Sequence, residues 1–505
     1  MKRALLAILA TALLCGCNRN PELKAVNAAA EAMGGKDRVL AVRTLTIEGE
    51  GENPNLGQNL TPDAPLTVWK VTNFKRTIDL TKGLDKGRMR VEQVRTAQFP
   101  FALNSVSRQN MLLDGNVAWN VNEDGSPSSR LTDKAALDRR IELLHHPVTI
   151  LQAALDPAAK LSQFRTSAKL KLFDIVTANG DILTLALDGT THLPASVISM
   201  TDQPNLGDVA IETSFTDYED VNGLKLPKHL TTKIDKWVQS DIRVSKYTVN
   251  GSAGDLAAPS TVSSALAAPA NPPLEVTSEQ VAPGIWWLAG SGNHRSVVFE
   301  FADHLTLFEL PESEARAKAV IEKARSLAFG KPLTEVIVSH HHFDHSAGLR
   351  LAVSEGLTII TQRGNVAFFK DLATRKHTIV PDELGKNFSA LPIKLKPVDD
   401  ELVLKDASME LDLYHVKDNS HSGTLLMGWV PRDHILVQAD LYDSGWLKYP
   451  WADNLKKNVE LRNLKVEKDV PIHGDIESWA DVLKRMQEQA KEKEKQQRTG
   501  NQSPP

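Results

Sequence analysis

The side chains best suited to chemistry in this chain lie close together in the segment VSHHHFDH. His340 and His342 are two residues apart, so in extended backbone both imidazoles point to the same side and can bind one metal ion. Asp344 and His345 follow at the expected turn into a helix, where they can face a second ion. Imidazoles and carboxylates are ligands that zinc accepts readily. His341 lies between two candidate ligands and is expected to point the other way.

Four ligands from one segment cannot complete two metal sites, so further His and Asp side chains are expected after later strands. His421 lies in a loop between two apolar strands, Asp440 ends the next strand, and His473 follows an apolar run. His415 ends a strand shortly before His421 and competes with it for the ligand role. His434 is expected to be a surface residue on the opposite rim. The other histidines have no ligand-like spacing, and no role is assigned to them: His145, His146, His192, His229, His294, His304 and His377.

The region from about residue 281 to residue 479 resembles the metallo-β-lactamase superfamily of hydrolases, whose signature HxHxDH matches residues 340–345. The resemblance implies an αββα sandwich that holds two zinc ions. It gives the first ion the ligands His340, His342 and His421 and the second ion Asp344, His345 and His473, with Asp440 as a bridge between them. By the same resemblance, Asp344 would be the catalytic residue that orients the nucleophile and passes a proton.

The elements around these residues indicate an α/β fold for the C-terminal half, because strands and helices alternate there. We expect strands at 281–290, 296–301, 304–310 and 333–339 and helices at 312–328 and 346–354. The fold class expected for the whole chain is α/β, with this sandwich preceded by a separate, mainly antiparallel β domain that carries helices.

The N-terminal half is predicted to be mainly β, because apolar and polar residues alternate over 44–51, 66–80, 87–96 and 111–122. One helical stretch, over 133–155, is expected to interrupt these strands. This half weakly resembles the lipoprotein-carrier half-barrels of bacterial envelopes, and a generic scaffold that packs on the enzyme is the alternative. The expected divisions of the chain are a signal peptide with its lipidation site at 1–17, the β domain at 25–250, a linker rich in Ala, Ser and Pro at 251–275, the hydrolase domain at 276–480, and a charged helix with a disordered tail at 481–505.

The N-terminus predicts export. Lys2 and Arg3 precede an apolar run that is too short to span a bilayer. The run ends in LCGC, which resembles the lipobox of bacterial lipoproteins and makes Cys17 the expected lipidation site. The predicted location is therefore the bacterial cell envelope, with the domains anchored by lipid in the periplasm or outside. The chain has 2 cysteines, both in this segment, so no disulfide or thiolate ligand is expected.

The amino-acid composition and net charge limit the classes of partner that this chain is expected to bind. The 41% hydrophobic and 24% charged residues of this 505-residue chain are typical of a globular protein, and the formal charge of −4 gives no electrostatic footprint for nucleic acid. The expected partners are a small-molecule substrate and, through the N-terminal lipid, a membrane.

The predicted activity is hydrolysis by a hydroxide that bridges two zinc ions, with a small ester, lactone, thioester, amide or phosphodiester as substrate. The cysteine-free subclass of β-lactamases stays open, although it commonly lacks a bridging acid such as Asp440. Two other functions are weighed against hydrolysis. One is a lipid- or lipoprotein-binding envelope module in which the metal domain is structural, and the other is mononuclear iron oxygenation of a sulfur compound.

Overall fold

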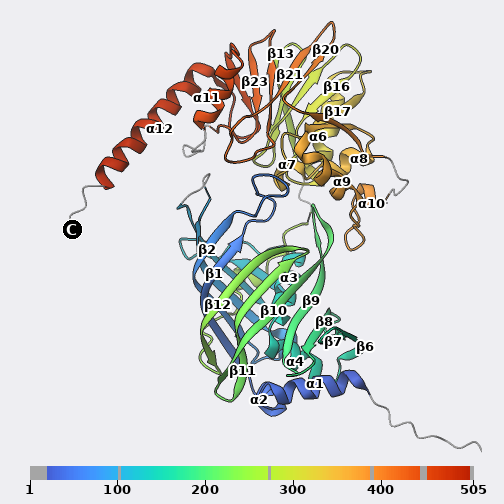
Figure 1. Ribbon diagram of the computed structural model, residues 1–505, viewed down its shortest axis with the longest axis vertical. Coiled ribbons are helices and arrows are strands. Elements are labelled where there is room, and N and C mark those ends of the chain that lie inside the picture. The colour runs from blue at the N-terminus through green and yellow to red at the C-terminus, as the bar shows by residue number, and fades with distance from the viewer. Residues whose placement is uncertain (1–19, 100–103, 271–273, 387–391, 444–451, 501–505) are drawn as a thin grey trace, which may run out of the picture.

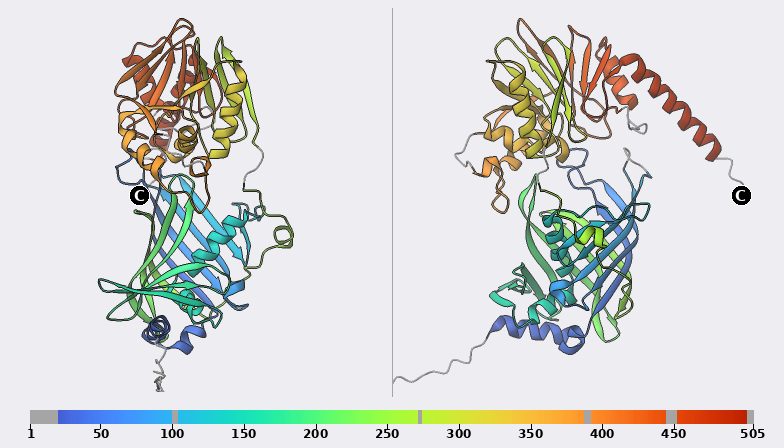
Figure 2. Two further views of the ribbon diagram at one scale, coloured as in Figure 1. Left: turned by 90° about the vertical axis from the view of Figure 1, so that its right-hand side faces the viewer. Right: turned by 180° about the vertical axis from the view of Figure 1, so that it is seen from behind.

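The computed structural model describes residues 20–99, 104–270, 274–386, 392–443 and 452–500, and the chain is drawn in Figure 1. The signal segment and Cys17 lie outside the described residues. Two parts are stacked end to end, an N-terminal β part and a C-terminal α/β part, as Figures 1 and 2 show. Among the described helices, none is both long and apolar enough to cross a membrane.

The N-terminal part is one curved antiparallel sheet. Its first and last strands, β1 and β12, pair with each other in the middle, and successive hairpins run outward on both sides in the order β5-β4-β3-β2-β1-β12-β11-β10-β9-β8-β7-β6. The predicted mainly antiparallel β domain is therefore confirmed. The strands are β1 Thr44–Pro54, β2 Val68–Asp79, β3 Arg88–Ala97, β4 Val106–Asp114, β5 Val117–Asn120, β6 Lys160–Ser167, β7 Leu170–Val176, β8 Ile182–Asp188, β9 Pro194–Gln203, β10 Gly207–Val221, β11 Leu224–Ile234 and β12 Trp237–Val249.

Helices pack on one face of this sheet, and alternate strand residues point toward them to form a single core. The helices are α1 Pro21–Ala32, α2 Lys36–Leu40, α3 Asp133–Leu144 and α4 Pro147–Leu155. The helical stretch expected over 133–155 is found, and it consists of two helices, α3 and α4, with a break between them. Pro147 disfavours helical backbone at the preceding residue, and His146 is extended there with φ −146 and ψ 143.

The C-terminal part contains two mixed sheets. The first has the order β13-β14-β15-β16-β17-β18-β19 and the second β20-β21-β22-β23-β24-β25. The strands of the first are β13 Val276–Ala282, β14 Ile285–Gly290, β15 Ser296–Glu300, β16 Leu305–Phe308, β17 Leu333–Ile337, β18 Thr358–Gln362 and β19 Lys394–Val398. Those of the second are β20 Glu401–Lys405, β21 Glu410–His415, β22 Leu426–Val430, β23 Ile435–Gln438, β24 Lys468–Pro471 and β25 Glu477–Ser478.

The two sheets face each other, with helices on both outer surfaces. Apolar residues of the first sheet such as Phe299 and Ile337 share a buried cluster with residues of the second such as Leu413 and Val437. The helices α6 Glu314–Leu327, α8 Leu349–Ser354 and α9 Val366–Thr374 cover the first sheet. The second sheet is covered by α11 Ala452–Leu461 and by the first turns of α12 Trp479–Gly500, whose remainder projects away from the sandwich (Figure 1). Two further short helices are α7 Phe343–Ser346 and α10 Glu383–Lys386. The predicted αββα sandwich is confirmed.

The helix after the metal-binding segment differs from the prediction of one helix at 346–354. It is split into α7 and α8 at Gly348, where a Cβ atom would lie 2.5 Å from the Cβ of Leu310 and 2.7 Å from the Cβ of Ala317. Glycine is therefore needed for the close approach of this turn to α6 and the end of β16.

Two turns at one end of the N-terminal sheet reach the C-terminal part (Figure 1). One is the loop between β1 and β2. The other is the turn between β9 and β10, where the Asn205 amide donates to the Phe343 carbonyl over 2.8 Å and the Asp208 N–H donates to the Lys376 carbonyl over 2.8 Å. Leu206, beside them, is buried in the cluster that α6, α8 and α9 form on the first sheet.

Candidate metal centre

The segment HHHFDH follows the central parallel strand β17, which is fixed on both sides by its neighbours. The backbone continues in register past the strand, because the Val338 N–H donates to the Ile360 carbonyl and the Ser339 carbonyl accepts from the Leu426 N–H. This last bond joins the two sheets at the site. The histidines are thus held by backbone that belongs to the core of the sandwich.

Among the described residues, four side chains form the first of two groups that could hold a metal ion. His340, His342, His421 and Asp440 each offer a ligand atom, and these atoms lie within 4.8 Å of one another. All four are buried. They come from three separate segments, namely the end of β17, the loop between β21 and β22, and the residues after β23.

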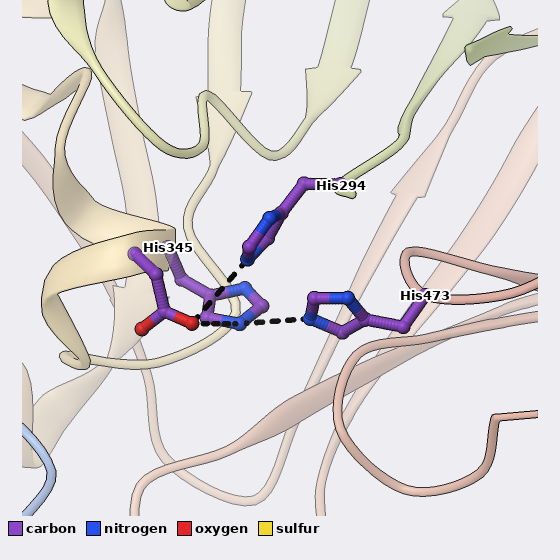
Figure 3. Close-up of side chains that lie close together, drawn as sticks. His294, His345 and His473 are labelled. Carbon is purple, nitrogen blue, oxygen red and sulfur yellow. Dashed lines mark hydrogen bonds and ion pairs between the residues drawn. The ribbon is translucent and has the colours of Figure 1, made fainter. Parts of the chain in front are cut away.

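The second group contains His294, Asp344, His345 and His473, whose ligand atoms also lie within 4.8 Å of one another. Figure 3 shows the rings of His294, His345 and His473 converging from three segments. The His294 Nε2 atom lies 3.3 Å from Asp344 Oδ2, and His473 Nε2 lies 3.4 Å from His345 Nε2.

Asp440 joins the two groups. Its Oδ2 atom lies 2.8 Å from His421 Nε2 and 3.1 Å from His345 Nε2, while its Oδ1 atom lies 2.8 Å from His473 Nε2. One carboxylate therefore faces imidazoles of both groups. This is the geometry that a bridging ligand needs. The structure brings together all seven residues for which the resemblance implied a metal role.

The ionised carboxylates of the two groups favour a positive charge between them. Burial opposes a charge on His345, but the carboxylates of Asp440, Asp344 and Glu309 outweigh it and raise the pKa of His345 well above its ordinary value. Burial lowers the pKa of His340 to about 3 and that of His342 well below its ordinary value, so both rings are neutral at neutral pH. Burial opposes ionisation of Asp440, but the neighbouring His345 and His473 hold its pKa well below the usual range. Neutral imidazoles beside ionised carboxylates are the state that a metal cation requires.

Glu309 orients one of these ligands from behind. The residue is fully buried, its Oε1 atom accepts from the Ser339 N–H at 2.7 Å, and its Oε2 atom lies 3.0 Å from His345 Nδ1. Because a carboxylate only accepts, Nδ1 keeps a proton, and Nε2, which faces Asp440 and His473, is the nitrogen that would bind a metal ion after giving up its own proton. Metal-binding histidines commonly have such a carboxylate partner.

The hydrogen bonding of His342 is a second, independent observation that fits a metal ion. His342 is buried, and its Nδ1 atom has no hydrogen-bond partner among the described residues. Its other nitrogen, Nε2, lies 2.9 Å from the carbonyl oxygen of Asn59 and must donate to it. The Nδ1 lone pair is therefore left to the first group, where no hydrogen-bond donor among the described residues meets it. A buried acceptor without a partner is destabilising, and a bound metal ion would remove this destabilisation.

Other histidines of the sequence lie outside both groups. His341 points its Nδ1 atom to Thr424 Oγ1 at 3.1 Å, as expected of a side chain turned away. The His415 Nε2 atom donates to the Gly423 carbonyl at 2.9 Å, so this residue does not take the place of His421. His434 is exposed and its Nδ1 atom lies 3.1 Å from Glu467 Oε1.

Sequence reasoning missed three contributors to the site. No role was assigned to His294, yet it belongs to the second group and its Nδ1 atom lies 3.0 Å from Glu312 Oε1. Glu309 was missed because it resembles any acidic residue at a strand end. Its φ of +75, rare outside glycine, is not visible in the sequence. The third contributor is the loop between β1 and β2, since nothing local marks a segment that meets the centre only through the fold.

Comparison with known proteins gives a limited result. No protein-family model matches the chain, and no match was found among curated proteins. Similar solved structures include the DIM-1 metallo-β-lactamase exposed to ceftazidime, with 17% identity over 43% of this chain and 97% of that chain at a TM-score of 0.32. The metallo-β-lactamase from Pontibacter korlensis has 13% identity over 42% of this chain and 97% of that chain, at a TM-score of 0.32. The metallo-β-lactamase from Hirschia baltica has 14% identity over 42% of this chain and 95% of that chain, also at a TM-score of 0.32.

Proposed function

We propose that this chain is a metal-dependent hydrolase of the metallo-β-lactamase superfamily, and that it works with two zinc ions. The observation that carries the proposal is the placement of Asp440 between two groups of ligands, each of which offers four side chains within reach of one ion. Groups of His and Asp without cysteine suit zinc well. A pair of bound zinc ions would supply an activated water as nucleophile and a Lewis acid for the oxygen of the bond that is cut.

The chain's own residues position and protect this chemistry. Asp344 has one oxygen, Oδ2, near His294 and His345, and a second, Oδ1, on the other side. A carboxylate at this place is suited to orient a nucleophile and to accept its proton. The burial of His340, His342 and His345 keeps bulk water away from the ligand atoms, which strengthens electrostatic interactions inside the site.

The proposed substrates are small molecules with an ester, lactone, thioester, amide or phosphodiester bond. The two cysteines of the chain lie at residues 15 and 17, outside the described residues, and no thiolate is available among the proposed ligands. This speaks against the β-lactamase types that use a cysteine ligand. Because Asp440 is placed as a bridge, esters, lactones, thioesters and phosphodiesters are favoured over β-lactams.

The proposed location is the bacterial cell envelope, with a lipid anchor at Cys17. The support for this is the export signal and the lipobox-like LCGC of the sequence. Replacement of Cys17 by Ser should release the protein from the membrane fraction in cells. Recovery of the Cys17→Ser protein in the membrane fraction at the level of the wild type would contradict a lipid anchor at this residue.

Hydrolysis is tested with a panel of chromogenic ester, lactone, thioester, phosphodiester and β-lactam substrates on the purified protein. His342→Ala should lose turnover and bound zinc together, whereas the adjacent His341→Ala should keep bound zinc because His341 lies outside both groups. A wild-type protein with one iron and no hydrolysis would contradict the proposal. So would tight co-purification of lipid with no turnover of any substrate.

A further inference from the structure

The loop between β1 and β2 belongs to the N-terminal sheet but ends at the metal centre. Four consecutive residues, 57–60, bond to the two segments that carry His342, Asp344 and His421. The bonds run from the Phe343 N–H to the Gly57 carbonyl over 3.3 Å, from Gln58 Nε2 to Asp344 Oδ1 over 2.9 Å, from His342 Nε2 to the Asn59 carbonyl over 2.9 Å, and from the Gly423 N–H to the Leu60 carbonyl over 2.7 Å.

The bond to Asn59 fixes the tautomer of His342. A carbonyl oxygen can only accept, so the proton of the ring is on Nε2 and the lone pair is on Nδ1. The Nδ1 atom is the one directed into the first group without a partner among the described residues. Without this bond the ring could carry its proton on either nitrogen, and only one of the two tautomers presents a metal-binding atom.

The bond from Gln58 fixes Asp344. A carboxylate can only accept, so the amide nitrogen of Gln58 donates to Oδ1 and leaves Oδ2 to the second group. Gln58 thus holds the carboxylate in one rotamer. Asp344 is two-fifths exposed, more than any other residue that pairs in the two groups, and it is therefore the one most in need of such a restraint.

The loop's own hydrogen bonds and close contacts fix its shape where it meets the metal centre. Asn59 is buried, and its side-chain nitrogen donates to the carbonyls of Thr61 and Pro62 at 2.6 and 3.0 Å. Gly57 has a φ of +76, and a Cβ atom there would lie 2.4 Å from the Phe343 ring. The loop is therefore shaped for close contact with this segment, and an ordinary side chain at position 57 would not fit.

From these contacts we propose that the β1–β2 loop is a built-in part of the metal centre, in which Gln58 is a positioning residue for Asp344 and the Asn59 carbonyl is one for His342. The inference rests on the proposed function, because it assigns the loop's role to the two-metal site. The N-terminal sheet then supplies part of the enzyme's site, and it is more than a scaffold that packs on the hydrolase.

The test is stepwise binding of Zn²⁺ or Co²⁺ to the full chain after the metal is removed, measured against a competing chelator. Gln58→Ala and the similarly shaped Gln58→Met should weaken one of the two binding steps about tenfold and leave the other unchanged. The Co²⁺ absorption of the unaffected step should keep its wild-type form. A general loss of structure would weaken both steps, so this selectivity separates positioning from folding.

Gln98→Ala is the matched control, because Gln98 lies in the same N-terminal part and, within the described part of the chain, its side-chain amide donates to the main-chain carbonyls of Thr96 and Ala97. It should bind both ions as the wild type does. Gly57→Ala should shift the whole loop and weaken both steps. If both Gln58 variants bind two ions with wild-type affinity, the inference about the loop is overturned while the two-metal site stands. If the wild type itself does not bind two ions, both fail.

Discussion

Replacement of Glu309 by Gln tests whether this carboxylate orients His345, a member of the second group of candidate ligands. The change keeps the size of the side chain and removes only its charge and one acceptor. Glu309 is buried between the Ser339 N–H and His345 Nδ1, at 2.7 and 3.0 Å from its two oxygens. A glutamine has one oxygen for these two places.

Both orientations of the new amide are unfavourable. With its oxygen on Ser339, its NH₂ group faces His345 and drives the proton of that ring from Nδ1 to Nε2, the atom 3.1 Å from Asp440 Oδ2. The proton then occupies the position at which a metal would bind. With its oxygen on His345, the NH₂ group faces the Ser339 N–H, and two donors meet in a buried place.

The magnitude follows from the bond that is lost. A hydrogen bond to a charged group contributes about 1.5–3 kcal/mol, and 1.4 kcal/mol corresponds to roughly a tenfold change in affinity. Glu309→Gln should therefore weaken one of the two metal-binding steps by about ten- to a hundredfold. Chelator competition on the metal-free protein measures this, with inductively coupled plasma analysis of the bound zinc.

The chain contains a matched control. Glu467 contacts His434 Nδ1 at 3.1 Å in the same kind of pair, but both side chains are exposed. Glu467→Gln should leave both binding steps unchanged. Wild-type zinc affinity in Glu309→Gln would refute the argument that this carboxylate sets the tautomer of His345.

Three further outcomes are expected. Arg316→Met should lower the free energy of unfolding, measured by urea titration, by on the order of 3 kcal/mol. The reason is that buried Arg316 donates to the carbonyls of Glu275 and Ala289, which would lose their donor. A change near zero would contradict this role of Arg316. Burial lowers the pKa of His145 to about 3, so between about pH 6.5 and pH 3 this residue binds a proton in the unfolded chain but not in the folded chain. The free energy of unfolding is therefore highest above about pH 6.5 and decreases as the pH falls. His145→Gln should therefore show a loss between pH 7 and pH 5 that is about 2 kcal/mol smaller than in the wild type, and equal losses would contradict the assignment. Removal of metal by a chelator should abolish hydrolysis and Zn²⁺ should restore it, whereas activity that survives full removal would exclude a metal mechanism.

The sequence alone predicted much of the fold and of the site, for a physical reason. Strand periodicity and the HxHxDH spacing are local, and the later ligands His421, Asp440 and His473 each follow an apolar strand, so they could be expected at one edge of the sandwich. The break between α3 and α4 could also have been anticipated, because Pro147 interrupts the helical pattern.

Other features could not be predicted, because they depend on contacts between distant segments. His294 has no neighbour in sequence that marks it as a ligand, and it reaches the second group only because the loop after β14 lies beside α7. Gln58 and Asn59 are ordinary polar residues of a loop far from the motif along the chain. Their role depends on how the N-terminal sheet meets the sandwich, which periodicity does not encode.

The most direct test of the central claim is anomalous diffraction at the zinc absorption edge from crystals of the zinc-loaded full chain. The account predicts two peaks about 3.5–4 Å apart, one beside His340, His342 and His421 and one beside Asp344, His345 and His473, with the Asp440 carboxylate between them. One peak only, or zinc bound away from Asp440, would contradict it.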